Sequence, residues 1–353
     1  MKTKVLCLLI FATSWSACTK YPLPESQREI SFPYSDEHIQ MEVVSTSLSE
    51  NIRAMHFINS QTGFVYTYEG ELYKTSDGGI TWVLKYSSPF QYQSYFQFLF
   101  TDQQTGYALS GTSWCPTANC EPPGGVLLKT TNAGETWIPV YQKKGQLSFA
   151  SIAMNMNGEL FILEKLNTGA NEPKSRIIKS IDSGLHWTEV ATMNVQYLKI
   201  AFHHQYGFLG GGSQASITRS TDHGITWNET QTFNNLWMYD ISFADNIGYA
   251  LGDQQAIYQT TDDGAHWQLI RHNQYDYAQL LALSDNRCLL LGCSGYSGGD
   301  MGIWYGGISQ TIDGGSHWFD IPLREIYTIS LGSFYNATDG YLLSNKLIKV
   351  HIK

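Results

Sequence analysis

Six acidic or amide side chains recur within one local sequence, Ser/Thr-x-Asp/Asn-x-Gly-x-x-Trp, which we term the box. They are Asp77, Asn132, Asp182, Asp222, Asp262 and Asp313. A repeated Asp could act as a catalytic acid or base. The same side chain can also accept hydrogen bonds from the backbone N–H groups just ahead of it, while the Gly that follows tolerates a positive φ. We therefore predict that the boxes form tight turns, with each Trp packing back over its turn.

The box recurs at intervals of 40 to 55 residues, from Trp82 to Trp318, which is typical of a repeat protein. A short β-rich segment precedes each box, so each predicts a strand, a turn and a further strand. The box resembles the Asp-box, or BNR, repeat. That resemblance implies a β-propeller in which the boxes lie on the edge remote from the functional face.

Other arrangements that could support catalysis are sparse. His186, His266 and His317 belong to boxes of different repeats, so they cannot share a metal ion, and His203-His204 is expected at a hairpin turn on the box side. Asp240, Asp253, Asp276 and Asp300 could face one another, but no pairing is evident in the sequence. We predict no catalytic residue, metal or cofactor.

Two enzyme families that resemble the chain through the box suggest an alternative. Sialidases bind a substrate carboxylate with three arginines, and Arg53, Arg271 and Arg324 are expected near the channel mouth. The Phe/Tyr-Arg-Ile-Pro start of that family is absent. Xyloglucan hydrolases use two paired propellers, whereas this chain has repeats for one. Because the box and the three arginines are present, we keep a sialidase-like glycoside hydrolase as an alternative function.

Aromatic side chains mark a candidate binding face opposite the boxes. Long segments at 111–125, 165–174 and 294–307 are expected on that face, where repeat proteins place binding surfaces. The candidate ligand-binding residues are Trp114, Tyr296, Trp304, Tyr305, Trp237, Tyr277 and Arg53. Such rings could stack on sugars or dock an extended peptide, or they could pack between neighbouring blades.

The elements that must position these residues are short strands, four in each repeat. In the first repeat we predict strands at 52–58, 62–68, 72–75 and 81–86. After Trp318, segments 327–331, 340–343 and 347–352 supply only three strands, while 39–46 is an unassigned strand before the first repeat. We therefore predict an all-β, seven-bladed β-propeller of four-stranded antiparallel blades, its last blade closed by the N-terminal strand. Six blades with loose ends are the alternative.

The first 38 residues have the composition of a targeting and tethering segment. Lys2 and Lys4 precede a short apolar run, and Ser16-Ala17 precede Cys18. This arrangement resembles a bacterial lipoprotein signal, although Trp15 replaces the usual Leu; an ordinary secretory signal is the alternative. We predict a signal peptide at 1–17, a lipid-anchored tether at 18–38 and one propeller domain at 39–353. The expected location is the cell envelope, anchored in the outer membrane.

Six cysteines fit an exported protein. Cys7 is removed with the signal peptide and Cys18 is the predicted lipidation site. Cys115 and Cys120 are close in sequence and form a candidate disulfide. Cys288 and Cys293 flank an apolar run, and we predict core thiols there, with a disulfide as the alternative.

Charge and overall resemblance restrict the partners. The formal net charge is −9, and removal of residues 1–17, which contain two Lys and no acid, makes it −11. Such a chain has no electrostatic attraction to nucleic acid or anionic lipid. Residues 39–353 resemble single-propeller proteins similar to the photosystem II stability and assembly factor, which implies a non-enzymatic scaffold; their Arg-rich patch is absent. We predict a monomeric extracytoplasmic propeller that binds a protein partner, with carbohydrate binding as an alternative.

Overall fold

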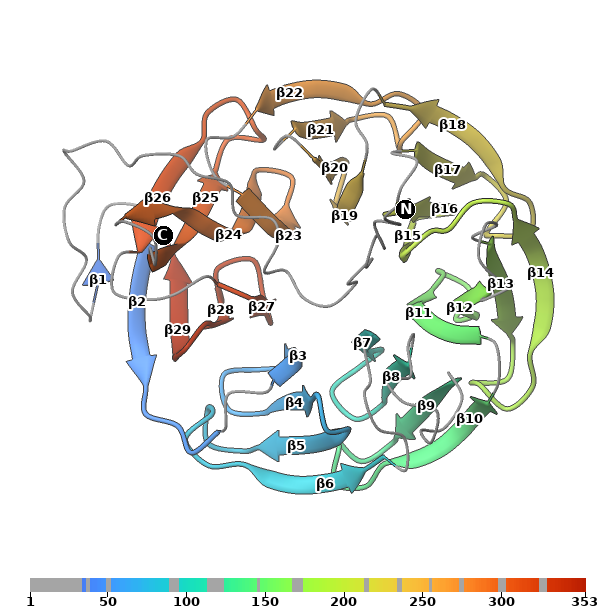
Figure 1. Cartoon of the computed structure of the whole chain (residues 1–353), viewed down its shortest axis with the longest axis horizontal. Coiled ribbons are helices and arrows are strands. Elements are labelled where there is room, and N and C mark those ends of the chain that lie inside the picture. The colour runs from blue at the N-terminus through green and yellow to red at the C-terminus, as the bar shows by residue number, and fades with distance from the viewer. Residues whose placement is uncertain are drawn as a thin grey trace, which may run out of the picture.

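Seven β-sheets form a closed ring around a central channel in the computed structural model (Figure 1). The structure describes residues 34–35, 39–48, 52–88, 95–112, 124–144, 147–166, 174–212, 216–233, 237–253, 256–272, 276–297, 303–323 and 329–353. Within each sheet, neighbouring strands are antiparallel. In six sheets they follow the order of the chain outward from the channel, and in the seventh the outermost strands come from the start of the chain. The predicted seven-bladed β-propeller is confirmed.

The blades follow one another along the chain. Blade 1 contains β3 (Ile52–Phe57), β4 (Gly63–Thr67), β5 (Glu71–Thr75) and β6 (Val83–Ser87). Blade 2 contains β7 (Tyr95–Phe100), β8 (Gly106–Thr112), β9 (Gly124–Thr130) and β10 (Ile138–Lys144). Blade 3 contains β11 (Leu147–Met154), β12 (Leu160–Leu166), β13 (Lys174–Ser180) and β14 (Thr188–Met193). Blade 4 contains β15 (Lys199–His203), β16 (Tyr206–Gly210), β17 (Ser216–Ser220) and β18 (Asn228–Thr232).

The remaining blades complete the circle. Blade 5 contains β19 (Met238–Ala244), β20 (Ile247–Gly252), β21 (Ala256–Thr260) and β22 (Gln268–His272). Blade 6 contains β23 (Asp276–Ser284), β24 (Arg287–Ser297), β25 (Ile303–Thr311) and β26 (Phe319–Leu323). Blade 7 contains β27 (Leu331–Phe334), β28 (Asp339–Leu343), β29 (Leu347–Ile352), β2 (Ile39–Val44) and β1 (Tyr34–Ser35).

The two ends of the chain close blade 7. β2 pairs with β29 over six residues, from Ile39 opposite Ile352 to Val44 opposite Leu347. Figure 1 shows this blue strand lying outside the red strands of the same blade. β1 adds a short fifth strand, from within the segment expected to be a tether. Closure pairs the ladder edge of β29 that would otherwise be exposed.

The hydrophobic core is divided among the seams between blades. Each cluster of buried side chains joins two neighbouring blades; Phe64 and Tyr66 of blade 1, for example, pack with Leu128 of blade 2. The second strand of a blade is covered on both faces, so β4 is buried along its whole length. The outer strand β6 is largely exposed. This difference explains why the second strands are nearly continuous apolar runs in the sequence.

Glycine at the start of a second strand makes room for an aromatic ring of the first strand. At Gly106, a Cβ would lie 2.6 Å from the ring of Phe100. That separation is too short for carbon atoms in contact. The Gly-Tyr/Phe pairs seen in the sequence are therefore a packing requirement of the turn between the first two strands.

Each box forms the turn between the third and fourth strands of its blade. In blade 1, Asp77 Oδ1 accepts hydrogen bonds from the Thr75 hydroxyl at 2.8 Å and the Thr81 N–H at 2.9 Å. Gly79 has a φ of 92°, and its carbonyl accepts the Trp82 indole N–H at 2.9 Å. These contacts confirm that the boxes are turns with Trp packed over them.

One predicted strand is displaced. The first strand of blade 7 was expected at 327–331, whereas β27 spans Leu331–Phe334. Its register is set by pairing with β28, with Leu331 opposite Leu343. Within the described residues, no helix has the length and apolar character needed to cross a membrane.

Candidate functional site

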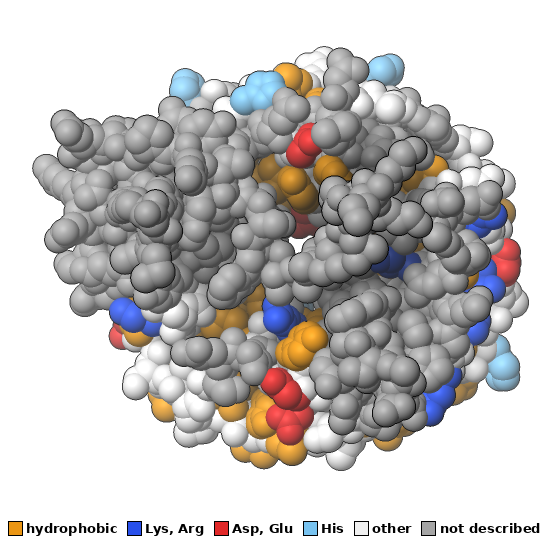
Figure 2. Space-filling model, viewed as in Figure 1, with side chains coloured by type: hydrophobic (Ala, Val, Ile, Leu, Met, Phe, Trp, Pro, Cys, Tyr) orange, Lys and Arg blue, Asp and Glu red, His pale blue; other side chains and the backbone are white. Residues whose placement is uncertain are grey.

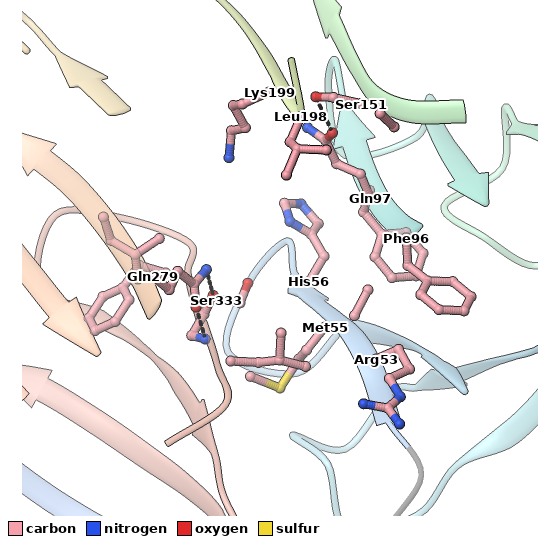
Figure 3. Close-up of a pocket in the computed structure, with 17 residues that line it drawn as sticks. Arg53, Met55, His56, Phe96, Gln97, Ser151, Leu198, Lys199, Gln279 and Ser333 are labelled. Atoms are coloured by element: carbon pink, nitrogen blue, oxygen red, sulfur yellow. Dashed lines mark hydrogen bonds between the residues drawn. The ribbon is translucent and has the colours of Figure 1, made fainter. Parts of the chain in front are cut away.

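The central channel contains a cavity of about 370 Å³. The innermost strands of blades 1, 2, 3, 4, 6 and 7 contribute its lining. Figure 3 shows Arg53, His56, Gln97 and Lys199 arranged around this space. In the face shown in Figure 2, hydrophobic, Lys or Arg, and Asp or Glu side chains are all visible near the central opening. No Asp or Glu is among the described residues that line the cavity.

A belt of polar side chains links the innermost strands from blade to blade. Its members are Gln97, Ser151, Asp240, Gln279 and Ser333, which we term the polar belt. Each accepts a hydrogen bond from a backbone N–H of the next blade. The Gln97 carbonyl oxygen, for instance, accepts from Ile152 N–H at 3.0 Å. The polar belt uses these side chains to satisfy backbone N–H groups between neighbouring blades.

The remaining seams of the ring use other contacts. Between blades 4 and 5, Lys199 Nζ lies 2.9 Å from Asp240 Oδ1. Between blades 1 and 2, the ring of His56 stacks on Phe100, with centroids 5.1 Å apart. Burial lowers the pKa of His56 to about 4, so its imidazole is neutral at pH 7. The seam between blades 1 and 2 therefore adds an uncharged ring to the cavity.

Arg53 brings a positive charge to the cavity without a carboxylate partner among the described residues. Its guanidinium lies over the ring of Tyr68, 5.1 Å from the centroid. Its Nε is buried and donates no hydrogen bond within the described chain. A guanidinium presents five donors that match a carboxylate. Arg53 is thus the charged group of the cavity with the most unused hydrogen-bonding capacity.

The box acids lie on a different part of the blades and are occupied by their own turns. Hydrogen bonds from the side chain and backbone of Thr81 lower the pKa of Asp77 to about 2. For Asp262, hydrogen bonds from His266 outweigh the effect of burial and also lower the pKa to about 2. Each stays ionised at neutral pH, as an acceptor should.

The other predicted binding residues are placed as follows. Tyr277 is only 2% exposed and belongs to the core between blades 5 and 6, so it does not line the channel as expected. Trp237 is half-buried before β19 and is not among the residues that line the cavity. Arg271 was expected near the channel mouth, but it lies on the outer strand β22 and pairs with Asp320 at 2.7 Å.

The segment 294–307 was expected to be a long loop, but part of it extends the central hairpin of blade 6. β24 and β25 remain paired beyond the residues that contact β23 and β26. In this extension the backbone of Tyr296 pairs with that of Trp304, and Gly295 pairs with Tyr305. The side chains of Tyr296, Trp304 and Tyr305 are not described. Trp114, Arg324, Asp300, Cys18, Cys115 and Cys120 lie outside the described residues.

Of the four acids considered for catalysis, Asp240 serves the polar belt. Its Oδ1 accepts the N–H of Ile241 at 2.9 Å and its Oδ2 that of Leu280 at 3.1 Å. Cys288 is a free, fully buried thiol, as predicted for a core position; the side chain of Cys293 is not described.

Two features of the site, the polar belt and His56, were not identified from the sequence. The polar belt residues alternate with apolar residues in the first strands, a pattern that also fits ordinary half-exposed strands. His56 was not singled out, because one histidine in an apolar strand carries no distinctive pattern. The recurrence of one polar residue in each first strand is the signal that could have revealed the belt.

Comparisons with known proteins identify the fold. No family model matches the chain, and no curated protein matches it. A structure of YCF48 bound to D1 peptide aligns with a TM-score of 0.65 and 16% identity, covering 93% of this chain and 99% of that one. YCF48 from Cyanidioschyzon merolae aligns with a TM-score of 0.59 and 13% identity over 88% and 98% of the two chains. An ancestral GH74 enzyme aligns at 0.58 and 13% identity, covering 88% of this chain and 45% of the enzyme. At these identities the comparisons show a shared propeller fold.

Proposed function

We propose that the protein is a non-enzymatic binding propeller that holds an extended segment of a protein partner at its central channel. The observation that carries this proposal is Arg53, which lines the cavity and has no carboxylate partner among the described residues. A partner segment with an acidic side chain or a terminal carboxylate would supply that missing acceptor.

The rest of the cavity suits a peptide. Phe96 and Met55 provide apolar surface, while Gln97 and Gln279 place amide groups nearby. Mixed apolar and polar linings of this kind are typical of sites that orient a ligand by a few polar contacts. The shared fold with YCF48, whose structure holds a D1 peptide, adds support for a protein ligand.

Glycoside hydrolysis is less well supported. Most glycoside hydrolases use two carboxyl groups on either side of the scissile bond, whereas sialidases use a Tyr nucleophile. No Asp or Glu is among the described residues of the cavity, and the box acids are engaged in turns. We assign the boxes to the Asp-box type on their sequence pattern, and we give them a structural role.

We also propose that the propeller is a lipoprotein of the cell envelope. The support is the sequence around Cys18, with a basic start, a short apolar run and small residues before the cysteine. Lipidation at Cys18 would tether the propeller to the outer membrane through residues 19–38. The partner would then be another extracytoplasmic protein.

The proposed function is tested by affinity enrichment from an envelope extract on the immobilised protein. The Arg53→Ala variant should lose about tenfold of the enrichment of a specific protein, because a central Arg contact is removed. Arg53→Lys keeps the charge but not the paired donors, so it should recover only part of the binding.

Arg219→Ala is the matched control. Arg219 lies over the ring of Tyr206 at 4.1 Å on β17, an Arg–Tyr contact like that of Arg53 but not among the residues that line the cavity. It should leave enrichment unchanged. Equal enrichment by wild type and Arg53→Ala would contradict the proposal, and binding on a glycan array without any protein partner would favour a carbohydrate ligand.

A further inference from the structure

Two histidines and one acid meet at the seam between blades 4 and 5, at the turn ends of the strands. His203 ends β15, His204 begins the turn to β16, and Asp263 lies in the box between β21 and β22. Their candidate ligand atoms all lie within 4.8 Å of one another. The seam thus brings together three groups that bind divalent metals.

The two separations that involve Asp263 are close to those expected around one small ion. Asp263 Oδ1 lies 3.6 Å from His203 Nε2 and 3.3 Å from His204 Nδ1. Two ligands bound about 2.0–2.1 Å from a tetrahedral Zn²⁺ are roughly 3.3–3.4 Å apart. The three atoms could therefore bind one Zn²⁺ with small adjustments, leaving a fourth position for water or another ligand.

The backbone conformation at this turn places the side chains of His203 and His204 on the same side. Successive side chains of a strand normally point to opposite faces. His204 has a φ of 52°, in the left-handed region, and its ring centroid lies 4.0 Å from that of His203. The equivalent turn of blade 5 has Asp245 at a φ of 46°, so the turn itself does not require histidine.

His203 has a buried ring nitrogen with no hydrogen-bond partner among the described residues. That atom is Nε2, the one facing Asp263. The ring is stacked on Phe243, with the two centroids 5.0 Å apart, and this packing fixes its orientation. An unpaired buried nitrogen is otherwise costly.

The turn that contains Asp263 does not require an acidic residue at that position. Asp263 occupies the variable position between the box Asp/Asn and the box Gly. The other five boxes carry Gly78, Ala133, Ser183, His223 and Gly314 there. The carboxylate at Asp263 is therefore special to the box that faces the two histidines.

We propose that His203, His204 and Asp263 form a Zn²⁺ site that links blades 4 and 5. The proposal is independent of the channel function, because none of the three residues lines the cavity. The bound ion would add a further link between two blades that are joined by packed side chains and by the Lys199–Asp240 ion pair.

The test is Zn²⁺ titration of the purified full chain by calorimetry, together with the visible spectrum of the Co²⁺ form. We expect one ion per chain and a tetrahedral Co²⁺ spectrum. His204→Ala and Asp263→Asn should weaken binding by at least about tenfold. Both side chains are substantially exposed, so these substitutions should leave the fold intact.

His266→Ala and His186→Ala are the matched controls. Each removes an exposed histidine that already contacts a box acid, at 2.7 Å in His266–Asp262 and 2.6 Å in His186–Asp182. Neither should alter Zn²⁺ affinity. Zn²⁺ should also raise the thermal midpoint of wild type and of both controls, but not of Asp263→Asn.

Two results would overturn the proposal. The first is the absence of saturable Zn²⁺ binding to the wild-type chain. The second is binding that is unchanged in Asp263→Asn and His204→Ala, or that is lost in His266→Ala, because the ion would then be held by scattered surface histidines.

Discussion

Asp222 accepts hydrogen bonds from both the backbone N–H and the hydroxyl of Thr226, at 2.8 and 2.7 Å. Burial alone would raise the pKa of Asp222, but these bonds and that from Ser220 outweigh it and lower the pKa. In the second box the amide of Asn132 serves the same turn, accepting from the Thr136 N–H at 3.0 Å. The box therefore requires an acceptor of the right length, whether or not it carries charge.

This comparison predicts the effect of two substitutions. Asp222→Asn should retain most of the stability at neutral pH, because Asn132 shows that an amide fits. Asp222→Ala should lose about 1 kcal/mol, as expected for loss of hydrogen bonds in a turn. Urea unfolding of the two variants and wild type measures the difference.

Acid pH separates charge from geometry in the same variants. The folded-state pKa of Asp222 is lowered, so its carboxylate stabilises the fold above its ordinary pKa and loses that effect as pH falls through the lowered value. Asp222→Asn has no such group and should be less acid-sensitive than wild type. If Asp222→Asn were as unstable as Asp222→Ala at neutral pH, charge would be the essential property.

At the scale of elements, blade 7 depends on a strand from the opposite end of the chain. Its outer strand β2 places Ile39 and Met41 in the same core cluster as Ile348 and Val350. Without β2, the edge of β29 would be exposed and this apolar surface uncovered.

Deletion of residues 39–44 should therefore lower the thermal midpoint and cause self-association through the free edge of β29. Size-exclusion chromatography and thermal unfolding measure the two effects. Deletion of residues 19–33, which precede β1, is the control and should leave a monomer of wild-type stability. Unchanged stability after loss of β2 would show that the ring does not depend on this closure.

The ends of a strand were predictable where a motif or a Gly in the sequence marks them. The box fixes the end of β5 at Thr75, and a Gly fixes the start of β4 at Gly63. The first strand of blade 7 was displaced because no box or Gly lies at its start, and β-propensity alone does not set pairing register.

The whole molecule brings together residues that are distant in sequence, and the sequence does not show which of them make contact. Ser333 of blade 7 accepts the N–H of Phe57 in blade 1 at 2.8 Å, and Asp263 meets His204 from another blade. Single-chain patterns show which residues occupy strands and turns, but not the angular position of each blade. The channel and its polar belt exist only once the ring closes.

Anchorage also belongs to this scale. Labelled palmitate should be incorporated into the wild-type chain expressed in a lipoprotein-processing bacterium, but not into Cys18→Ser, because the thiol is the acceptor. Cys288→Ser is the control, since that thiol is buried in the core. Equal labelling of Cys18→Ser, or none in the wild type, would contradict the proposed lipidation.

The way in which blade 7 is closed has a mechanical consequence. Every residue before Ile39 is joined to the ring through β2, and β2 is held by its ladder with β29. A pulling force applied at the N-terminus therefore crosses these six residue pairs before it reaches the other blades. The pairs between β2 and β29 bear the load before any other blade does. This ladder therefore sets the force at which the ring first opens.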